Sequence, residues 1–479
     1  MGAGPADEAV RPAAQGSALP KGNILCYHGD KLKSEGAALN EKLTARQLAL
    51  VGSMLFGLFF GAGNLIFPLI LGARAGQDLP AALLGLLITA TGIPLLGVMS
   101  IGLSRSEGLL DLSGQVSPRF RTLFTCALYL TIGPLFAIPR CAATSFTIGV
   151  SPFVGEAAWL WQLGFSVCFF GAVLYVSLKP SKILDSVGRF LNPAFLLFLG
   201  IMLAAALADP VQSAASVAPS GDYARSAFSA GFLQGYDTLD ALAGLAFGII
   251  VIRTIRQLGI SEPGRVAAST VKAGVVSMSL MAFLYAAIAL VGAQSFGLYA
   301  QRLSDPGFTG GDAFAMIARH YFGGAGGALL AVTVTLCCMK TAVGLVTSCA
   351  ETFEELFPGR LSYPQWAVAF SAASLLISNF GLSKIIEFSA PVLYFLYPPA
   401  IVLILLGLLG RSFHHARPVY QWTMWSTLAA AALELCRVVD FRPVAGLAER
   451  ILPFYPYGLG WVLPAVLGFA VGTILARKG

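Results

Sequence analysis

The residues best suited to bind a charged ligand lie in an apolar run from about Leu48 to Leu71. The run is long enough to span a bilayer, but Gly61, Gly63 and Asn64 disfavour a continuous helix, and Pro68 removes a backbone donor. Broken backbone in hydrocarbon leaves polar groups unpaired, so it is tolerated only where protein, water or a ligand satisfies them. The sequence therefore predicts a binding site inside this run.

The predicted break offers two kinds of main-chain group. A half-helix that starts near Leu65 would direct free N–H groups and the positive end of its dipole toward an anion such as a carboxylate. Carbonyl groups around Phe60 to Ala62 would face a cation.

A second interruption is predicted in segment 231–244, where Asp237 and Asp240 lie among several glycines at membrane depth. On a continuous helix their spacing would put both carboxylates on one face. Because acids inside membranes are costly and usually functional, we predict that Asp240 orients a substrate ammonium or the helix break itself. The simpler alternative is that one or both carboxylates only keep a water-filled vestibule polar.

A stripe of small and polar side chains recurs at helical spacing in the apolar run 325–350. Its members are Thr333, Cys337, Lys340, Thr341, Gly344 and Ser348. Close helix packing would explain most of the stripe, but Lys340 is too far from either end to extend its ammonium to water. We expect Lys340 to pair with an anion inside the protein, Asp237 or Asp240, or to lose its proton.

Arg140 is the other cation inside an apolar run, and it follows Pro134 and Pro139. We expect a structural role for Arg140, as the partner of a carboxylate or a carbonyl in the outer half of the membrane. A position on a transport pathway is the alternative.

Composition assigns the chain to helical membrane proteins that cross the bilayer many times. Its 479 residues are 56% hydrophobic and 11% charged, whereas soluble proteins carry about 25% charged residues; the mean hydropathy is +0.76. The eight cysteines lie mostly in apolar runs, and the four histidines form no metal-binding pattern. We predict no disulfide, no metal cluster, no nucleic-acid binding and no enzymatic activity.

Apolar runs of about 20 residues predict about twelve membrane spans. They cover 47–71, 79–103, 121–148, 158–178, 190–208, 226–252, 268–294, 325–350, 363–380, 386–410, 419–437 and 456–476. Lys and Arg are concentrated in alternate loops, which predicts that both termini are cytoplasmic. Residues 1–45 hold Lys21, Lys31, Lys33 and Lys42 among small and polar residues and contain no apolar h-region, so we expect a disordered cytoplasmic tail rather than a signal peptide.

The two predicted breaks fall in the first and the sixth span. An odd number of spans per unit inverts the second unit relative to the first. Within a transporter domain of residues 46–476, we therefore predict one repeat over 46–208 and an inverted repeat over 226–410. The spans in 419–476 are appended to them.

The segment Phe56-Gly57-Leu58-Phe59-Phe60-Gly61-Ala62-Gly63-Asn64-Leu65-Ile66-Phe67-Pro68 closely resembles the signature of the bacterial branched-chain amino acid:cation symporter family (LIVCS, BrnQ-type). Weaker similarities occur at 235–248 and 341–345, and the resemblance extends over about residues 43 to 476. It implies an all-α membrane protein with the LeuT-like 5+5 inverted repeat of the amino acid–polyamine–organocation superfamily, with helices 1 and 6 interrupted.

The resemblance also implies a site. Main-chain groups of Gly61, Ala62, Gly63 and Asn64 would receive the substrate carboxylate and one cation, and carbonyls near Phe60, Tyr236 and Asp240 would receive the amine. The apolar side chain would lie against Phe59, Tyr236 and Phe247. For cation coupling the predicted residues are Gly61, Asn64, Asp237, Lys340 and Thr341. A sodium ion, where one is used, would bind at Ala62, Asn64 and Thr341; no other cofactor is implied.

One position departs from the family pattern. A small or hydroxyl residue often precedes the position of Thr341 in the family, and adjacent hydroxyls there bind sodium in related folds, but this chain has Lys340. Its ammonium could take the place of the sodium ion and make transport proton-coupled, or uncoupled from sodium at this site. The alternative is that Lys340 points away into an ion pair.

Together these features predict a secondary importer of leucine, isoleucine and valine in the cell membrane, coupled to sodium or protons by alternating access. Two alternatives remain open: an importer of another neutral amino acid on the same fold, and an amino-acid receptor that does not transport. Competition experiments with leucine, isoleucine and valine would test the first alternative. Binding of the amino acid without net flux would support the second.

Overall fold

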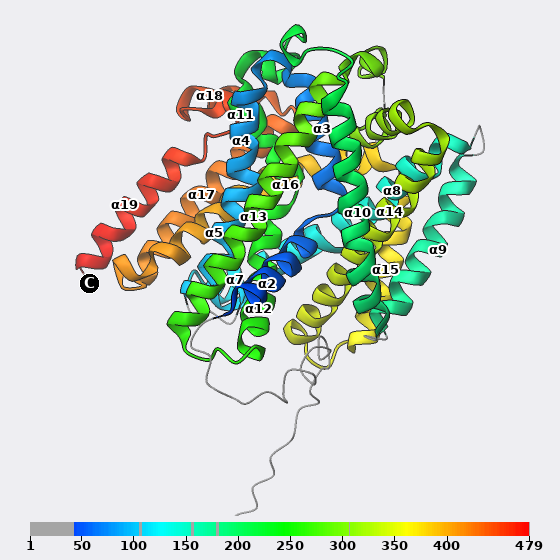
Figure 1. Cartoon of the computed structure of the whole chain (residues 1–479). Coiled ribbons are helices and arrows are strands. Elements are labelled where there is room, and N and C mark those ends of the chain that lie inside the picture. Colours follow the sequence, from blue (N-terminus) through cyan, green and yellow to red (C-terminus); the bar gives the residue numbers. More distant parts are fainter. Residues whose placement is uncertain (1–42, 105–107, 155–157, 179–181, 306, 479) are drawn as a thin grey trace, which may run out of the picture.

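The computed structural model describes residues 43–104, 108–154, 158–178, 182–305 and 307–478, all of whose regular structure is helical (Figure 1). This agrees with the all-α class predicted from the sequence. Of the predicted tail 1–45, residues 1–42 lie outside the described residues.

The first apolar run forms two helices, α2 (Ala45–Phe59) and α3 (Ala62–Ala75), separated by Phe60 and Gly61 in extended conformation. The second half-helix thus begins at Ala62 and not near Leu65 as predicted. Pro68 lies inside α3, so the break is set by the residues before Asn64 rather than by the proline.

The sixth run is also divided. Helices α11 (Asp222–Asp237) and α12 (Asp240–Gln257) are bent by 47° relative to each other. Leu239 between them has a φ of 67°, a left-handed conformation that is uncommon for a residue with a branched side chain. Its buried side chain holds this turn in place.

Most of the remaining helices overlap the predicted runs. The remaining helices are α4 (Leu79–Leu87), α5 (Ile93–Leu103), α6 (Leu109–Gly114), α7 (Pro118–Leu130), α8 (Ala137–Gly149), α9 (Ala158–Leu178), α10 (Lys182–Ala208), α13 (Pro263–Gln294), α14 (Gly310–Leu356), α15 (Tyr363–Ser378), α16 (Leu382–Leu409), α17 (Arg417–Val438), α18 (Arg442–Ile451) and α19 (Val462–Lys478). Helices α6 and α18 lie outside the predicted runs, and α10 and α14 begin well before theirs. Two segments are π-helical. Segment η2 (Ile88–Gly92) joins α4 to α5, and η3 (Thr131–Leu135) follows α7 and leads to α8. Short 3₁₀ segments occur at η1 (Gly76–Asp78), η4 (Ser151–Phe153), η5 (Ala214–Ser216), η6 (Phe296–Leu298), η7 (Ala300–Arg302), η8 (Gly410–Phe413) and η9 (Tyr455–Tyr457).

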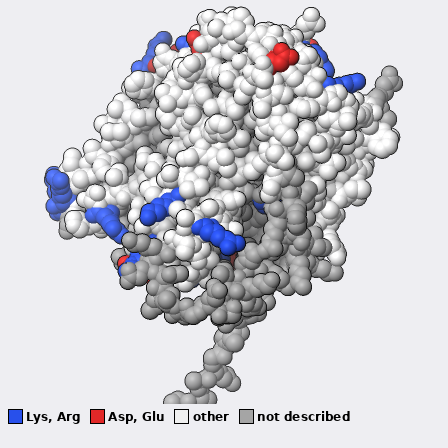
Figure 2. All heavy atoms as spheres, viewed as in Figure 1, with Lys and Arg blue, Asp and Glu red and all other residues white. Residues whose placement is uncertain are grey.

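The helices form a multi-pass membrane protein. Among the described residues, 6 helices or helix runs are long and apolar enough to cross a bilayer, and the bent pair α11–α12 makes up to 7; α2 and Phe195–Ala208 are shorter apolar helices. On the face drawn in Figure 2, charged side chains gather toward the two ends of the helices, and the broad belt between them carries none. Such a belt fits the hydrocarbon layer.

The broken helices lie at the centre of the bundle. Helix α3 packs along α13, α11 packs along α4, and α8 packs along α14. Helices α2 and α12 lie side by side in the lower half of Figure 1, while α17, α18 and α19 lie along one side of the bundle.

Glycines bring two of these pairs into backbone contact. A Cβ atom on residue 72 of α3 would lie 1.7 Å from the Ala289 carbonyl oxygen of α13, and one on Gly231 of α11 would lie 1.9 Å from the Ala82 oxygen of α4. Small residues at such crossings let helices approach closely in membranes.

We predict that Gly72→Ala forces α3 and α13 apart and lowers the free energy of unfolding by at least the roughly 1–3 kcal/mol of ordinary overpacking. The apparent melting temperature of the purified protein in detergent measures this. Gly171→Ala on the exposed face of α9, where a Cβ meets nothing within 4 Å, is the matched control. Equal melting temperatures for the two variants would contradict the prediction.

Candidate binding site between the broken helices

The two helix breaks are joined by the side chain of Asn64. Its Oδ1 accepts a hydrogen bond of 2.7 Å from the Gly61 N–H, while its Nδ2 donates to the Asp240 carboxylate at 3.0 and 3.2 Å. Both Asn64 and Asp240 are 2% exposed. Asn64 therefore closes the start of α3 and ties it to the start of α12.

The Asp240 carboxylate receives its other strong hydrogen bond from α13. The Tyr285 hydroxyl donates to Oδ2 of Asp240 at 2.6 Å and is itself in contact with Nδ2 of Asn64. Both groups that bind the carboxylate are neutral donors, and the carboxylate lies in the first turn of α12, where the helix dipole favours a negative charge. Among the described residues, no Lys or Arg pairs with Asp240 within 4.0 Å.

Asp237 faces away from Asp240, on the other side of the left-handed Leu239. Its carboxylate accepts a 2.7 Å hydrogen bond from Nε2 of Gln234, and its main-chain carbonyl accepts one of 2.7 Å from Nη1 of Arg140. The two carboxylates therefore lie on different faces, whereas on a continuous helix they would share one.

A small cavity of about 40 Å³ lies where the two breaks meet. It is lined by Leu58, Phe59, Gly61, Ala62, Gly63, Asn64, Ile132, Ala137, Arg140, Cys141, Thr238, Leu239, Asp240, Ala243, Phe247, Thr341 and Leu345. Space of this size holds about three water molecules. A larger and more polar space of about 360 Å³, here called the vestibule, has Gln234 and Asp237 in its lining, together with Arg74, Asp222 and Arg437.

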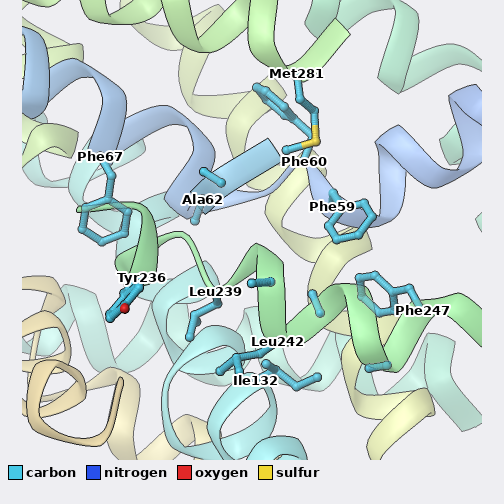
Figure 3. Packing of buried hydrophobic residues seen from close by; sticks show 14 of the residues in the cluster. Phe59, Phe60, Ala62, Phe67, Ile132, Tyr236, Leu239, Leu242, Phe247 and Met281 are labelled. Carbon is cyan, nitrogen blue, oxygen red and sulfur yellow. The ribbon is translucent and has the colours of Figure 1, made fainter. Parts of the chain in front are cut away.

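The predicted site residues divide between the cavity and its surroundings. Gly61, Ala62, Gly63, Asn64, Asp240 and Thr341 line the cavity, whereas Phe60, Tyr236, Asp237 and Lys340 are not part of its lining. The ring of Tyr236 stacks on Tyr397 with centroids 4.2 Å apart. Figure 3 shows Phe59 and Phe247 facing each other, with Tyr236 on the far side of Leu239.

Main-chain oxygens gather beside Thr341. Its hydroxyl lies 3.5 Å from the Phe60 carbonyl oxygen and 3.3 Å from that of Cys337. The neighbouring Lys340 is half-buried, and within the described part of the chain it has no carboxylate within 4.0 Å. The predicted pairing with Asp237 or Asp240 is therefore not formed; instead Gln234 holds the first of these carboxylates, and Asn64 with Tyr285 the second.

Sequence reasoning did not assign helix α8 to the site. Three residues of α8 line the cavity: Ala137, Arg140 and Cys141. They do so because the backbone is not helical at Gly133 and Phe136, and α8 begins at Ala137. The expected carbonyl partner of Arg140 is present at Asp237. The charge in an apolar run pointed to Arg140, for which a structural role was preferred and a position on the transport pathway was the alternative.

We predict that Asn64→Ala lowers the free energy of unfolding by about 1–3 kcal/mol, because it leaves the buried Gly61 N–H unpaired and removes a donor from Asp240. Thermal unfolding in detergent measures the change. The control is Asn379→Ala, which removes only a local hydrogen bond from the Asn379 side chain to the Leu375 carbonyl of α15. Asn379 is half-buried. A loss no greater than that of the control would refute the role of Asn64.

A family model described as "Branched-chain amino acid transport protein" matches residues 44–479. The chain is 48% identical over 456 residues to the branched-chain amino acid permease BrnQ of Lactobacillus delbrueckii subsp. lactis, with 92% of this chain and 98% of the relative covered. It is 39% identical over 443 residues to BrnQ of Bacillus subtilis (91% and 98% covered) and 35% identical over 439 residues to BrnQ of Escherichia coli K12 (92% and 98% covered).

Among solved structures, the chain is similar to Mhp1, a nucleobase-cation-symport-1 family transporter in a closed conformation with bromovinylhydantoin bound. The TM-score is 0.53 at 14% identity, over 90% of this chain and 92% of the other. This likeness supports the transporter fold alone. The relatives are permeases and not enzymes, and the resemblance found in the sequence is confirmed: the chain belongs to the branched-chain amino acid transport protein family.

Proposed function

We propose that the protein imports leucine, isoleucine and valine by alternating access, driven by an inward cation gradient. The observation that carries this proposal is the buried cavity between two broken helices, with Asn64 and Asp240 linking them. The relatives named as branched-chain amino acid permeases support the choice of substrate.

We further propose about twelve spans, of which 46–208 and 226–410 form an inverted repeat and 419–476 are appended. Two contacts support the repeat. The first span packs on the seventh through α3 and α13, and correspondingly the sixth packs on the second through α11 and α4. Both termini then lie in the cytoplasm, and the vestibule faces outward.

The substrate would bind in the cavity after the bundle opens, since the cavity is too small for an amino acid in this conformation. The N–H groups at the start of α3 favour a carboxylate; the Gly61 N–H is already bound to Asn64, so the free donors are those of Ala62, Gly63 and Asn64. Phe59 and Phe247 would contact the apolar side chain. An apolar pocket separates side chains that differ by one methylene by only about 1–3 kcal/mol, so all three amino acids are accepted.

We expect liposomes that contain the purified protein to accumulate labelled leucine when an inward cation gradient is imposed. Excess isoleucine or valine should abolish most of this uptake, whereas alanine and glutamine should not. Liposomes without protein are the control. If another neutral amino acid competes more strongly, the proposed choice of substrate is wrong. Binding without uptake under any gradient would favour the alternative of a receptor that does not transport.

For the coupling ion we propose that the Lys340 ammonium takes the place of sodium and that protons drive uptake. Three oxygens gather at Thr341: its hydroxyl and the carbonyls of Phe60 and Cys337. They are ligands suited to a hard cation. Lys340 directly precedes Thr341 in the sequence, and within the described ranges it has no carboxylate partner. A lysine that gains and loses its proton with each cycle would couple transport to protons.

The prediction is that leucine uptake responds to a proton gradient and not to sodium, and that Lys340→Thr makes it depend on sodium. Uptake into liposomes under each gradient separately measures both. Lys272→Thr, at an exposed position on α13, is the control and should leave the ion dependence unchanged. If the unmodified protein requires sodium, the proposed role of Lys340 is wrong.

A further inference from the structure

Arg140 is a buried cation that attracts Asp237 and Asp240 but is in direct contact with neither carboxylate among the described residues. Its side chain is 3% exposed, and among the described residues no carboxylate lies within 4.0 Å of it. The one hydrogen bond found for its guanidinium in that part of the chain runs from Nη1 to the Asp237 carbonyl. A carbonyl cannot neutralise a charge, and a charge buried in a membrane protein is costly unless an anion compensates it.

The guanidinium lies beside the start of α3. A Cβ atom on residue 63 would lie 2.8 Å from Nη2 of Arg140 and 3.3 Å from its Cζ, and Cζ is 5.0 Å from the centre of the Phe67 ring. Arg140 also lines the cavity. The free N–H groups of the first turn of α3 and the unused donors of Arg140 therefore border the same small space, which carries positive potential from both.

The opposite charge is present across the cavity. Asp240 also lines it, and the carboxylate is bound by neutral groups, Asn64, Tyr285 and Thr238. Arg140 and Asp240 attract each other, but no ion pair within 4.0 Å joins them among the described residues. This arrangement is complementary to a zwitterion, with Phe59 and Phe247 on the apolar side.

We propose that Arg140 binds the α-carboxylate of the substrate, together with the N–H groups at the start of α3. This inference rests on the proposed function, because it requires an amino acid as substrate. Arg140 is then a determinant of specificity: it selects ligands that carry a carboxylate. Its fork of N–H donors fits a carboxylate in a bidentate manner, which a lysine ammonium does not.

The test compares leucine with leucinamide, which keeps the ammonium and the side chain but lacks the anionic carboxylate. Affinities for the purified full-length protein are measured by competition with labelled leucine, or by direct binding of labelled leucinamide. We expect the unmodified protein to prefer leucine by about 10- to 100-fold, the usual contribution of a charged hydrogen-bonded pair. Arg140→Gln should reduce this preference to within about threefold, mainly by weakening leucine binding.

Two further variants separate this role from a structural one. Arg140→Lys keeps the charge and should retain an intermediate preference. Arg253→Gln, at an exposed position on α12, is the matched control and should leave the preference unchanged. If Arg140→Gln loses uptake but keeps the leucine preference, Arg140 only positions the helices and the proposal is wrong.

The unmodified protein alone also tests the proposal, should Arg140→Gln fail to fold. Equal affinities for leucine and leucinamide would overturn the role of Arg140 while leaving amino-acid transport intact. Absence of leucine binding to the unmodified protein would overturn the proposed function, and this inference with it.

Discussion

The structure depends on one amide side chain that satisfies two helix breaks at once. Asn64 accepts from the Gly61 N–H and donates to the Asp240 carboxylate. In hydrocarbon an unpaired backbone group or carboxylate costs several kcal/mol, so neither break would be stable alone at this depth. Asn64 pairs the Gly61 N–H of its own break and the Asp240 carboxylate of the other, so α3 and α12 begin at the same buried point. Tyr285 of α13 completes the junction.

The junction lies between the two half-helices of each broken span. Helix α13 packs on both halves of the first span, α3 and α2, whereas α11 packs on α4 and α12 on α5. Helices α2 and α12 lie together at one end. The vestibule reaches Asp237, whereas Asp240 borders the cavity. The Arg140–Asp237 contact thus lies between the vestibule and the cavity.

The sequence was sufficient to locate both breaks but not to orient their side chains. Glycine, asparagine and aspartate in apolar runs violate the composition of a membrane helix, and such violations can be read without a structure. The start of α3 was misplaced because Gly63 and Asn64 lie inside its first turn, where the Asn64 side chain caps the Gly61 N–H. Asp237 and Asp240 diverge because Leu239 adopts a φ of 67°, which no spacing rule anticipates. The pairing of Lys340 was inferred from topology alone, and the rotation of α14 about its axis is set by packing that composition does not encode.

The two charges of the cavity are held differently from ordinary structural ion pairs. In the described part of the protein, Asp240 is bound by an amide and a phenol, and Arg140 by a carbonyl. Neutral partners hold a charge in position without cancelling it. The opposite charges that remain to balance Arg140 and Asp240 in the cavity are their own, since the two groups attract each other without forming a close ion pair. If the proposed substrate binds here, a zwitterion would bring an opposite charge nearer to each group, whereas a ligand with one charge would do so for only one of them.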